Sequence, residues 1–329
     1  MIKKVLITGG VGTIGYFLGK YLAEQGQEVT LADNLFRGKV DEEVKKLLLL
    51  PNVKFIELDV TKAEDFSKLD SDYDFVYHLA AINGTKYFYE IPEKVLKVGV
   101  LGVINVLEWF KNNKKGKILL TSSNEAYASY INLQGGPIPT PETVPLCVED
   151  VLNPRWSYGG SKLIGELFFI NYSRAYNFPM AIVRYHNNYG PRTGFEHVIP
   201  QFLLRIIKKE DPFKIFGAKE TRAFCYMTDT IRATQQAMES DKTNGQIVHI
   251  GNDKEEISME DLAKKMFKLF DWQPENIEIE GAPEGCVKRR CPDLTKIREL
   301  VGYEPQVFLD EGLKKTYDWY CNWYQSNKG

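Results

Sequence analysis

The sequence is poor in the residues and spacings on which metal centres and disulfide frameworks depend. It has only four histidines, at positions 78, 186, 197 and 249, and they are scattered rather than placed in a pattern such as H-E-x-x-H. Its five cysteines include no C-x-x-C pair, and an odd number favours a reducing compartment over a disulfide framework. We therefore expect neither a metal cofactor nor a disulfide scaffold.

The chain also lacks an excess of charge and any long apolar run. Lys and Arg number 42 against 44 Asp and Glu, so the formal net charge of -2 provides no basic field to attract nucleic acid. No apolar stretch approaches the roughly 18 residues that a membrane span needs, and a first strand beginning at Ile2 leaves no room for a signal peptide. The expected partners exclude nucleic acid and membranes, and the expected location is the cytoplasm.

A glycine-rich turn follows the first strand and opens a helix. Gly9, Gly12 and Gly15 have the G-x-x-G-x-x-G spacing, which suits a tight turn, close approach of backbone to a pyrophosphate and close packing of helix on strand. The second strand ends in Asp33, about 20 positions further on, where a carboxylate accepts ribose hydroxyls and repels a 2′-phosphate. These features predict NAD rather than NADP. A turn that merely closes a βα unit is the alternative interpretation.

Further contacts with the dinucleotide are expected at the ends of the next two strands. Asp59 ends the third strand, where its carboxylate meets the adenine amino group, and small side chains after the fourth strand let backbone lie against the dinucleotide. His78, at the end of that strand, is interpreted as a satisfied, half-buried histidine. The predicted cofactor-binding residues here are Gly9, Gly12, Thr13, Ile14, Asp33, Asn34, Asp59, Val60, Leu79, Ala80 and Ala81.

Apolar strands alternate with helical patterns along most of the 329 residues. The strands are predicted at 2–7, 28–33, 53–58, 74–79, 117–122, 180–187 and 246–250. This alternation is typical of an α/β fold, a doubly wound parallel sheet of the Rossmann type, here with a smaller, partly inserted C-terminal substrate lobe. We assign residues 1–195 to the NAD-binding domain, with 223–251 returning to it, and 196–222 and 252–329 to the substrate lobe.

Two segments carry the expected chemistry. Tyr158 and Lys162 open a long helix and share one of its faces, and an ammonium near a phenol lowers the pKa of the phenol from about 10. The phenolate can then remove a proton from an alcohol. At the end of the fifth strand, where doubly wound sheets bind ligands, Ser123 is predicted to share that proton and Glu125 to act as a second base. A turn that only caps the strand is the alternative for Asn124.

Together these motifs resemble the extended short-chain dehydrogenase/reductases that remodel nucleotide sugars: epimerases, 4,6-dehydratases and uronic acid decarboxylases. The resemblance implies that hydride passes from the sugar C4 to tightly held NAD while Tyr158 takes the hydroxyl proton. It implies that Tyr185 lies against the nicotinamide, and that Asn124, Asn187, Arg222 and Arg290 contact the substrate. The segments that carry it are 8–15, 33–34, 78–81, 122–125, 158–162, 184–192, 221–224 and 290–293.

Within that family, Glu125 favours a 4,6-dehydratase-like outcome, because a glutamate there can abstract the proton next to the new ketone. The alternatives are a nucleotide-sugar 4-epimerase, a uronic acid decarboxylase, a 4-dehydrogenase or, from another class, a non-catalytic NAD-sensing protein. Asn124 replaces the acid that some dehydratases use on the departing hydroxyl, and a carboxamide cannot donate that proton. Gly99 stands where the family usually has Asn, and a long segment at 128–157 is expected to reshape the sugar pocket.

The helix that bears Tyr158 is more apolar than one sheet face requires. Leu163, Leu167 and Ile170 continue its apolar surface beyond the catalytic pair. The resemblance implies that such helices pair between two copies of the chain. A homodimer is therefore expected, acting on a nucleotide-diphosphate sugar whose base and sugar the motifs leave open.

Overall fold

A seven-stranded parallel sheet organises the computed structural model, which describes residues 1–113, 115–282 and 285–327. The strand order is β11-β6-β5-β4-β1-β2-β3, and every neighbouring pair is parallel. The fold class expected from the alternating pattern is confirmed. The strands are β1 (Lys4–Thr8), β2 (Glu28–Asp33), β3 (Val53–Glu57), β4 (Phe75–His78), β5 (Lys117–Ser123), β6 (Met180–Tyr185) and β11 (Gln246–Ile250).

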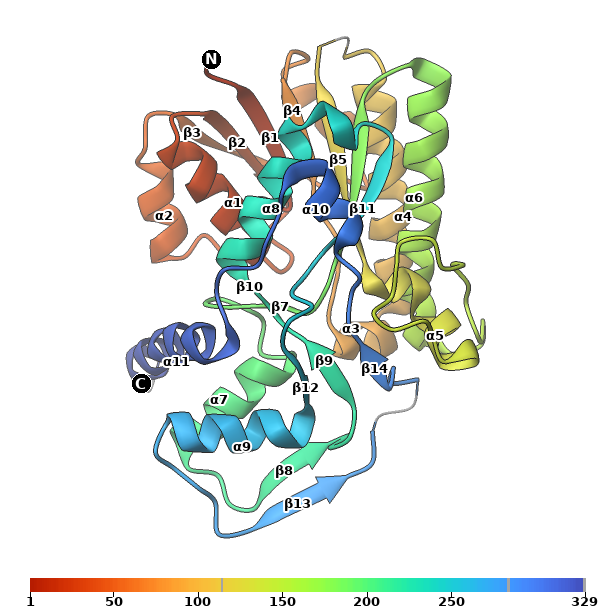
Figure 1. The fold of residues 1–329 in the computed structure, drawn as a ribbon. Coiled ribbons are helices and arrows are strands. Elements are labelled where there is room, and N and C mark those ends of the chain that lie inside the picture. Colours follow the sequence, from red (N-terminus) through yellow and green to blue (C-terminus); the bar gives the residue numbers. More distant parts are fainter. Residues whose placement is uncertain (114, 283–284, 328–329) are drawn as a thin grey trace.

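Helices cover both faces of this sheet (Figure 1). One buried apolar cluster joins the sheet to α1 (Thr13–Glu24), α8 (Met227–Glu239) and α10 (Thr295–Val301). A second cluster joins its other face to α4 (Pro92–Phe110) and α6 (Ser157–Tyr176). These last two helices pack so closely that a Cβ on Gly99 would lie 2.5 Å from the Ser161 hydroxyl, so that a larger side chain at position 99 would require Ser161 to move.

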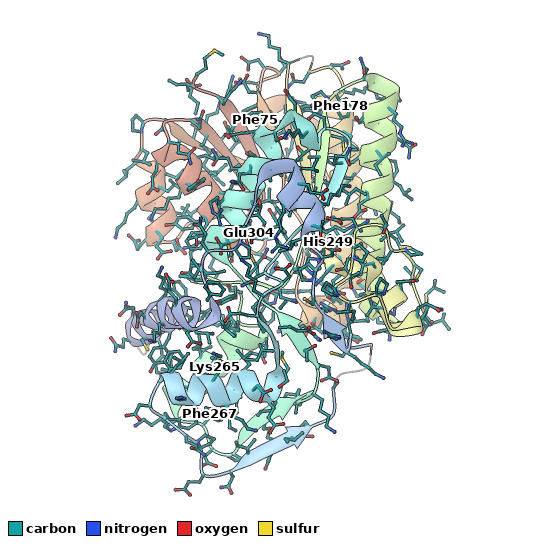
Figure 2. All side chains as sticks on the ribbon, in the orientation of Figure 1. Phe75, Phe178, His249, Lys265, Phe267 and Glu304 are labelled. Carbon is teal, nitrogen blue, oxygen red and sulfur yellow. The ribbon has the colours of Figure 1, made fainter. Side chains whose placement is uncertain are left out.

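A smaller lobe lies beyond the carboxyl ends of the strands and has a core of its own. Phe267 belongs to this core and Phe178 to the sheet domain, and the two lie near opposite ends of the molecule (Figure 2). The elements of this lobe are α7 (Val198–Lys208), β8 (Phe213–Phe216), β9 (Thr221–Ala223), β12 (Glu256–Ser258), α9 (Met259–Leu269), β13 (Ile277–Glu280), β14 (Arg289–Arg290) and α11 (Leu309–Ser326).

The expected domain boundaries stay a proposal, and the packing differs from them in one place. Residues 252–329 were all assigned to the substrate lobe, yet Leu294, Ile297 and Tyr303 are buried in the cluster that joins the sheet to α1 and α8. These residues flank or form α10. The segment around α10 therefore packs with the sheet domain.

Shorter elements complete the described chain. Among them, the long segment at 128–157 is joined to the strand that carries Arg290, because Thr140 N donates to Cys291 O (2.9 Å) and Asp293 N to Thr140 O (2.8 Å). The remaining elements are α2 (Glu42–Leu48), η1 (Ala63–Lys68), α3 (Thr85–Glu90), η2 (Asn124–Tyr127), α5 (Ala128–Gln134), η3 (Pro154–Trp156), β7 (Asn188–Tyr189), β10 (Cys225–Tyr226) and η4 (Asp241–Thr243). None of the described helices is long and apolar enough to cross a membrane.

Candidate active site

The glycine turn between β1 and α1 is shaped for close backbone contact. Gly9 has a φ of +70°, and a Cβ there would lie 2.9 Å from Ala80 N, so the turn packs directly on the segment after β4. A Cβ on Gly15 would lie 2.8 Å from Gly10 Cα. The first N–H groups of a helix have no partner inside it, and those of α1 are therefore available to a phosphate. The cradle that a pyrophosphate needs is present.

The acidic residues expected to hold the adenosine end β2 and follow β3. Asp33 is buried and its carboxylate accepts from Leu35 N (2.9 Å) and Val11 N (3.3 Å), which fixes it beside the glycine turn. Asp59 accepts from Thr61 N (2.9 Å) and from the Asn34 amide. Burial opposes ionisation of Asp59, but these hydrogen bonds hold its pKa below the usual value. Hydrogen bonds therefore fix both carboxylates at the ends of β2 and β3, and their contact with a ribose and a base stays a prediction.

Ser123, Tyr158 and Lys162 meet at the end of β5, as the sequence predicts. The Ser123 hydroxyl is within hydrogen-bond reach of the Tyr158 phenol. Lys162 Nζ is 5.5 Å from the centre of the Tyr158 ring and donates to Thr121 O at 2.7 Å. The phenol ring stacks on Phe88 of α3, with centroids 5.2 Å apart and an interplanar angle of 12°. All three predicted residues are buried, so water reaches them poorly.

The electrostatics of this group differ from the expectation that Lys162 lowers the pKa of Tyr158. Burial is the largest influence and raises the pKa of the phenol above its usual value, Glu125 raises it further, and Ser123 lowers it only in part. Burial also lowers the pKa of Lys162 to about 8. The spacing in the sequence could not show this, because it gives the position of the ammonium but not the depth of the pair.

Glu125 lies in η2 between two arginines that come from distant parts of the chain. Arg155 Nη2 and Arg290 Nη1 each lie 2.7 Å from a different oxygen of the carboxylate, and all three side chains are nearly inaccessible to solvent. Burial alone would raise the pKa of Glu125, but the charges and hydrogen bonds of both arginines lower it to about 2. Arg155 was missed by the sequence analysis, although it stands only three residues before Tyr158.

Of the other residues expected to contact substrate, Arg222 lies next to this ion-pair cluster. Arg222 of β9 donates to Cys286 Sγ at 3.3 Å and is close enough to Arg290 for their charges to repel, which adds to the effect of burial and lowers the pKa of Arg222 to about 10. Asn187 donates to Ala223 O at 3.1 Å, and Asn124 is buried next to Ser123.

Tyr185, which was expected to lie against the nicotinamide, ends β6 beside Ser123, with its hydroxyl 2.9 Å from that of Thr234. His78 is fully buried rather than half-buried, and its Nδ1 lies 2.8 Å from the Thr8 hydroxyl.

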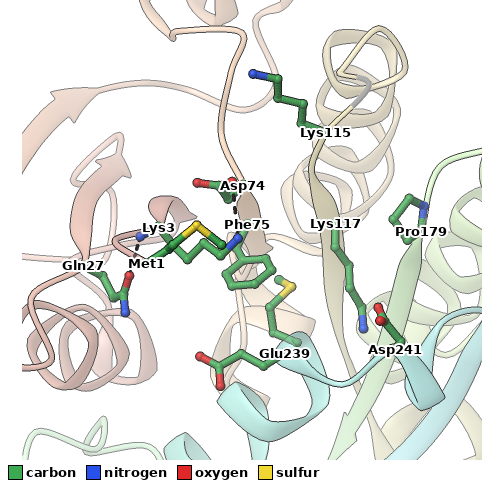
Figure 3. Close-up of a pocket in the computed structure, with 11 residues that line it drawn as sticks. Met1, Lys3, Gln27, Asp74, Phe75, Lys115, Lys117, Pro179, Glu239 and Asp241 are labelled. Atoms are coloured by element: carbon green, nitrogen blue, oxygen red, sulfur yellow. Dashed lines mark hydrogen bonds and ion pairs between the residues drawn. The ribbon is translucent and has the colours of Figure 1, made fainter.

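A cavity of about 450 Å³ lies at the opposite edge of the sheet, where the strands begin (Figure 3). Its charged lining includes Lys3, Asp74 and Lys117. The Lys117 ammonium donates to Ala237 O, Ser240 O and the Thr243 hydroxyl at 2.7 to 3.1 Å. Its three N–H groups are therefore all engaged by the end of α8 and the segment that follows it. We assign this cavity no part in the chemistry, because none of the predicted site residues reaches it.

Comparison with known proteins identifies the family to which this chain belongs. The model of the NAD dependent epimerase/dehydratase family matches residues 5–251, and the chain belongs to that family and is an enzyme of it with NAD as cofactor. A UDP-N-acetyl-alpha-D-glucosaminuronate decarboxylase of Bacillus cytotoxicus is 31% identical over 97% of this chain and 98% of its own. UDP-glucuronic acid decarboxylase 6 of Arabidopsis thaliana is 32% identical over 94% of this chain and 86% of its own.

A solved structure shows the same architecture. The UDP-glucuronic acid 4-epimerase of Bacillus cereus, solved in complex with NAD, superposes with a TM-score of 0.83 at 28% identity, covering 98% of this chain and 99% of that one. The glycine cradle and the two carboxylates described above fit such a cofactor. The relatives are named for different reactions, so the comparisons leave the exact activity open.

Proposed function

We propose that this enzyme oxidises C4 of a UDP-uronate, a UDP-sugar with a carboxylate on C5, and that the resulting 4-keto sugar loses this carboxylate as CO2. The two curated relatives above are named as decarboxylases of UDP-uronates, and the solved neighbour is named as an epimerase of one. A uronate is thus common to all three. The proposal differs from the 4,6-dehydratase-like outcome that Glu125 suggested in the sequence.

Tyr158 is the proposed base for the proton of the C4 hydroxyl, and Ser123 is placed to share that proton. Lys162 keeps a positive charge beside the phenol, although burial lowers its pKa to about 8. NAD, when bound, supplies the hydride acceptor and a positively charged nicotinamide ring. Because burial raises the pKa of Tyr158 in the structure described here, we expect the phenol to ionise only when further positive charge lies next to it.

The observation that carries the proposal is the pairing of Glu125 with Arg155 and Arg290. The two arginines bring two positive charges against one negative charge, and the nearby Arg222 adds a third. Arg155 Nη1 and Arg290 Nε are buried and have no hydrogen-bond partner in the described structure. Buried donors of this kind are costly unless a ligand satisfies them. A carboxylate on the substrate is the group that matches their charge and geometry.

Decarboxylation also fits the weak basicity of Glu125. Oxidation at C4 converts a uronate into a β-keto acid, in which the C5–C6 bond breaks, CO2 leaves and the electron pair moves onto the C4 oxygen. We expect the hydroxyls of Tyr158 and Ser123 to stabilise that oxygen, after which a proton returns to C5. The 4-keto pentose would then become the UDP-pentose when the hydride taken from C4 returns to C4 from the cofactor and Tyr158 returns the proton to the C4 oxygen. No base has to remove a proton from C5. A carboxylate whose pKa is held at about 2 is well suited to orienting arginines and poorly suited to acting as such a base.

The alternatives have less support from the site. A 4,6-dehydration needs a base at C5 and an acid for the departing hydroxyl, whereas Glu125 is held as a weak base and Asn124 cannot donate as an acid. The NAD-sensing alternative gives no role to the buried set of Ser123, Tyr158 and Lys162. The second candidate is 4-epimerisation of the same uronate, which the Bacillus cereus neighbour favours.

The test is a panel of UDP-sugars incubated with the NAD-loaded enzyme, with products identified by mass spectrometry and NMR. UDP-glucuronate and its N-acetylated analogue are expected to react, and UDP-glucose and UDP-galactose to react far more slowly. Arg155→Met is expected to abolish the preference for uronates, while Arg174→Met, at the exposed end of α6, serves as the matched control. Equal turnover of neutral and acidic sugars by the parent enzyme would contradict the proposal.

A further inference from the structure

Residues 190–197 contact the starts of two helices that flank the glycine turn and the segment after Asp33. The Thr13 hydroxyl at the start of α1 donates to Arg192 O at 2.7 Å. The Arg192 guanidinium pairs with Asp41 at 2.5 Å and with Glu43 at 2.9 Å, at the start of α2. Thr13 directly follows Gly12 of the glycine turn, and the loop before α2 follows Asp33 at the end of β2. We call residues 190–197 the clasp segment.

A second connection reinforces the clasp segment near its other end. Glu196 pairs with Arg37, which lies in the loop between Asp33 and α2, and the Arg37 guanidinium is 5.0 Å from the centre of the Tyr87 ring on α3. Loop, clasp segment and α3 are therefore linked in one chain of contacts. These contacts hold the clasp segment beside the loop that follows Asp33.

The C-terminal helix α11 holds the clasp segment from outside. Trp319 Nε1 donates to Glu43 at 2.9 Å, on the oxygen that Arg192 leaves free, and the Tyr320 hydroxyl donates to Thr193 O. The Phe195 ring packs between two rings of α11, 5.8 Å from that of Tyr320 and 4.6 Å from that of Trp323. The aromatic residues of α11 therefore contact the clasp segment as well as the core of the small lobe.

We propose that Trp319 and Tyr320 are positioning residues that keep the clasp segment closed over NAD and so slow its release. The dinucleotide cannot leave past this segment unless the contacts to α11 or to the walls open. Slow release matters for any reaction in which the hydride taken from C4 is returned. Loss of the reduced cofactor before that step would leave the 4-keto sugar without a hydride donor. The inference depends on the family cofactor and not on which UDP-sugar the enzyme uses.

The test measures the exchange of isotopically labelled NAD, loaded onto the purified protein, against an excess of unlabelled NAD. Trp319→Phe and Tyr320→Phe each remove one hydrogen bond while keeping an aromatic ring. Each is expected to speed NAD release about fivefold, which corresponds to the loss of about 1 kcal/mol per hydrogen bond, and the double variant at least tenfold. Tyr317→Phe is the matched control, because Tyr317 lies on the same helix but stacks on Phe270 of the small lobe.

A structural role alone would change thermal unfolding without changing release, so both are measured on the same samples. Glu43→Gln weakens the acceptor that Arg192 and Trp319 share and provides a variant outside α11. Combined with Trp319→Phe, it should speed NAD release by less than the product of the two separate effects, because both variants remove the same hydrogen bond. Release of NAD at the parental rate from folded Trp319→Phe, Tyr320→Phe and Glu43→Gln proteins would overturn the inference. Because no sugar is present, this result does not bear on the proposed decarboxylation.

Discussion

The ion-pair cluster around Glu125 makes a prediction about stability that can be worked out from the structure. The carboxyl has a pKa of about 2 in the folded protein, against an ordinary value of 4.5. Because folding depresses this pKa, the cluster contributes stability above about pH 4.5, and that contribution is lost as the pH falls toward 2. A difference of that size corresponds to about 3 kcal/mol of unfolding free energy.

Glu125→Gln isolates this contribution, because a carboxamide keeps the shape but does not titrate. At pH 7 the variant should be less stable than the parent by about 3 kcal/mol, since Arg155 and Arg290 lose their counter-charge. The gap should narrow steadily between pH 4.5 and pH 2. Glu24→Gln, an exposed pair to Lys20 on α1, should show almost no gap at any pH.

The assay is chemical denaturation of parent, Glu125→Gln and Glu24→Gln proteins across this pH range, with ellipticity as the signal. Differences between variants cancel the titration of every other carboxylate in the chain. A gap that stays constant from pH 7 down to pH 2 would show that Glu125 is not held ionised by the two arginines. The electrostatic argument for a substrate carboxylate would then fail as well.

Three further outcomes are expected. Tyr158→Phe should lower turnover roughly 10²-fold to 10⁴-fold and leave the cofactor oxidised, as followed by NADH fluorescence, while Tyr172→Phe on the same helix, which bonds to Glu108, should not. Asp33→Ala should narrow the preference for NAD over NADP in a binding titration; equal affinity of the parent for both would refute the role of this carboxylate. The exposed Leu96, Leu101 and Leu167 of α4 and α6 predict a homodimer by light scattering at micromolar concentration, and a monomer would contradict it.

Most of the fold follows from local patterns that are visible in the sequence. The seven strands of the sheet were expected within a few residues of where they lie, because each is a short apolar run bounded by a turn or a helix. The glycine turn, Asp33 and Ser123 could be placed together because parallel strands end at one edge of a sheet. Segments after residue 251 were harder to assign, since Ile297 and Tyr303 return to a core formed much earlier in the chain.

The site was less predictable where its chemistry depends on contacts between distant residues. Nothing in the local sequence of Glu125 indicates that Arg155 and Arg290 converge on it, because they arrive on η3 and β14. The raised pKa of Tyr158 has the same origin: it follows from burial, which a four-residue spacing does not reveal. The glycine at position 99 is likewise explained only by the structure, in which Ser161 packs directly against it.

The most direct test of the proposed activity follows one carbon atom. UDP-glucuronate labelled with carbon-13 at C6 is incubated with the NAD-loaded enzyme, and both the nucleotide sugar and the released gas are examined by mass spectrometry. The account predicts a UDP-pentose without the label and labelled CO2 in equal amounts, both formed roughly 10²-fold to 10⁴-fold more slowly by Tyr158→Phe. A product that keeps the label, whether an epimer of the uronate or the unchanged sugar, would contradict decarboxylation.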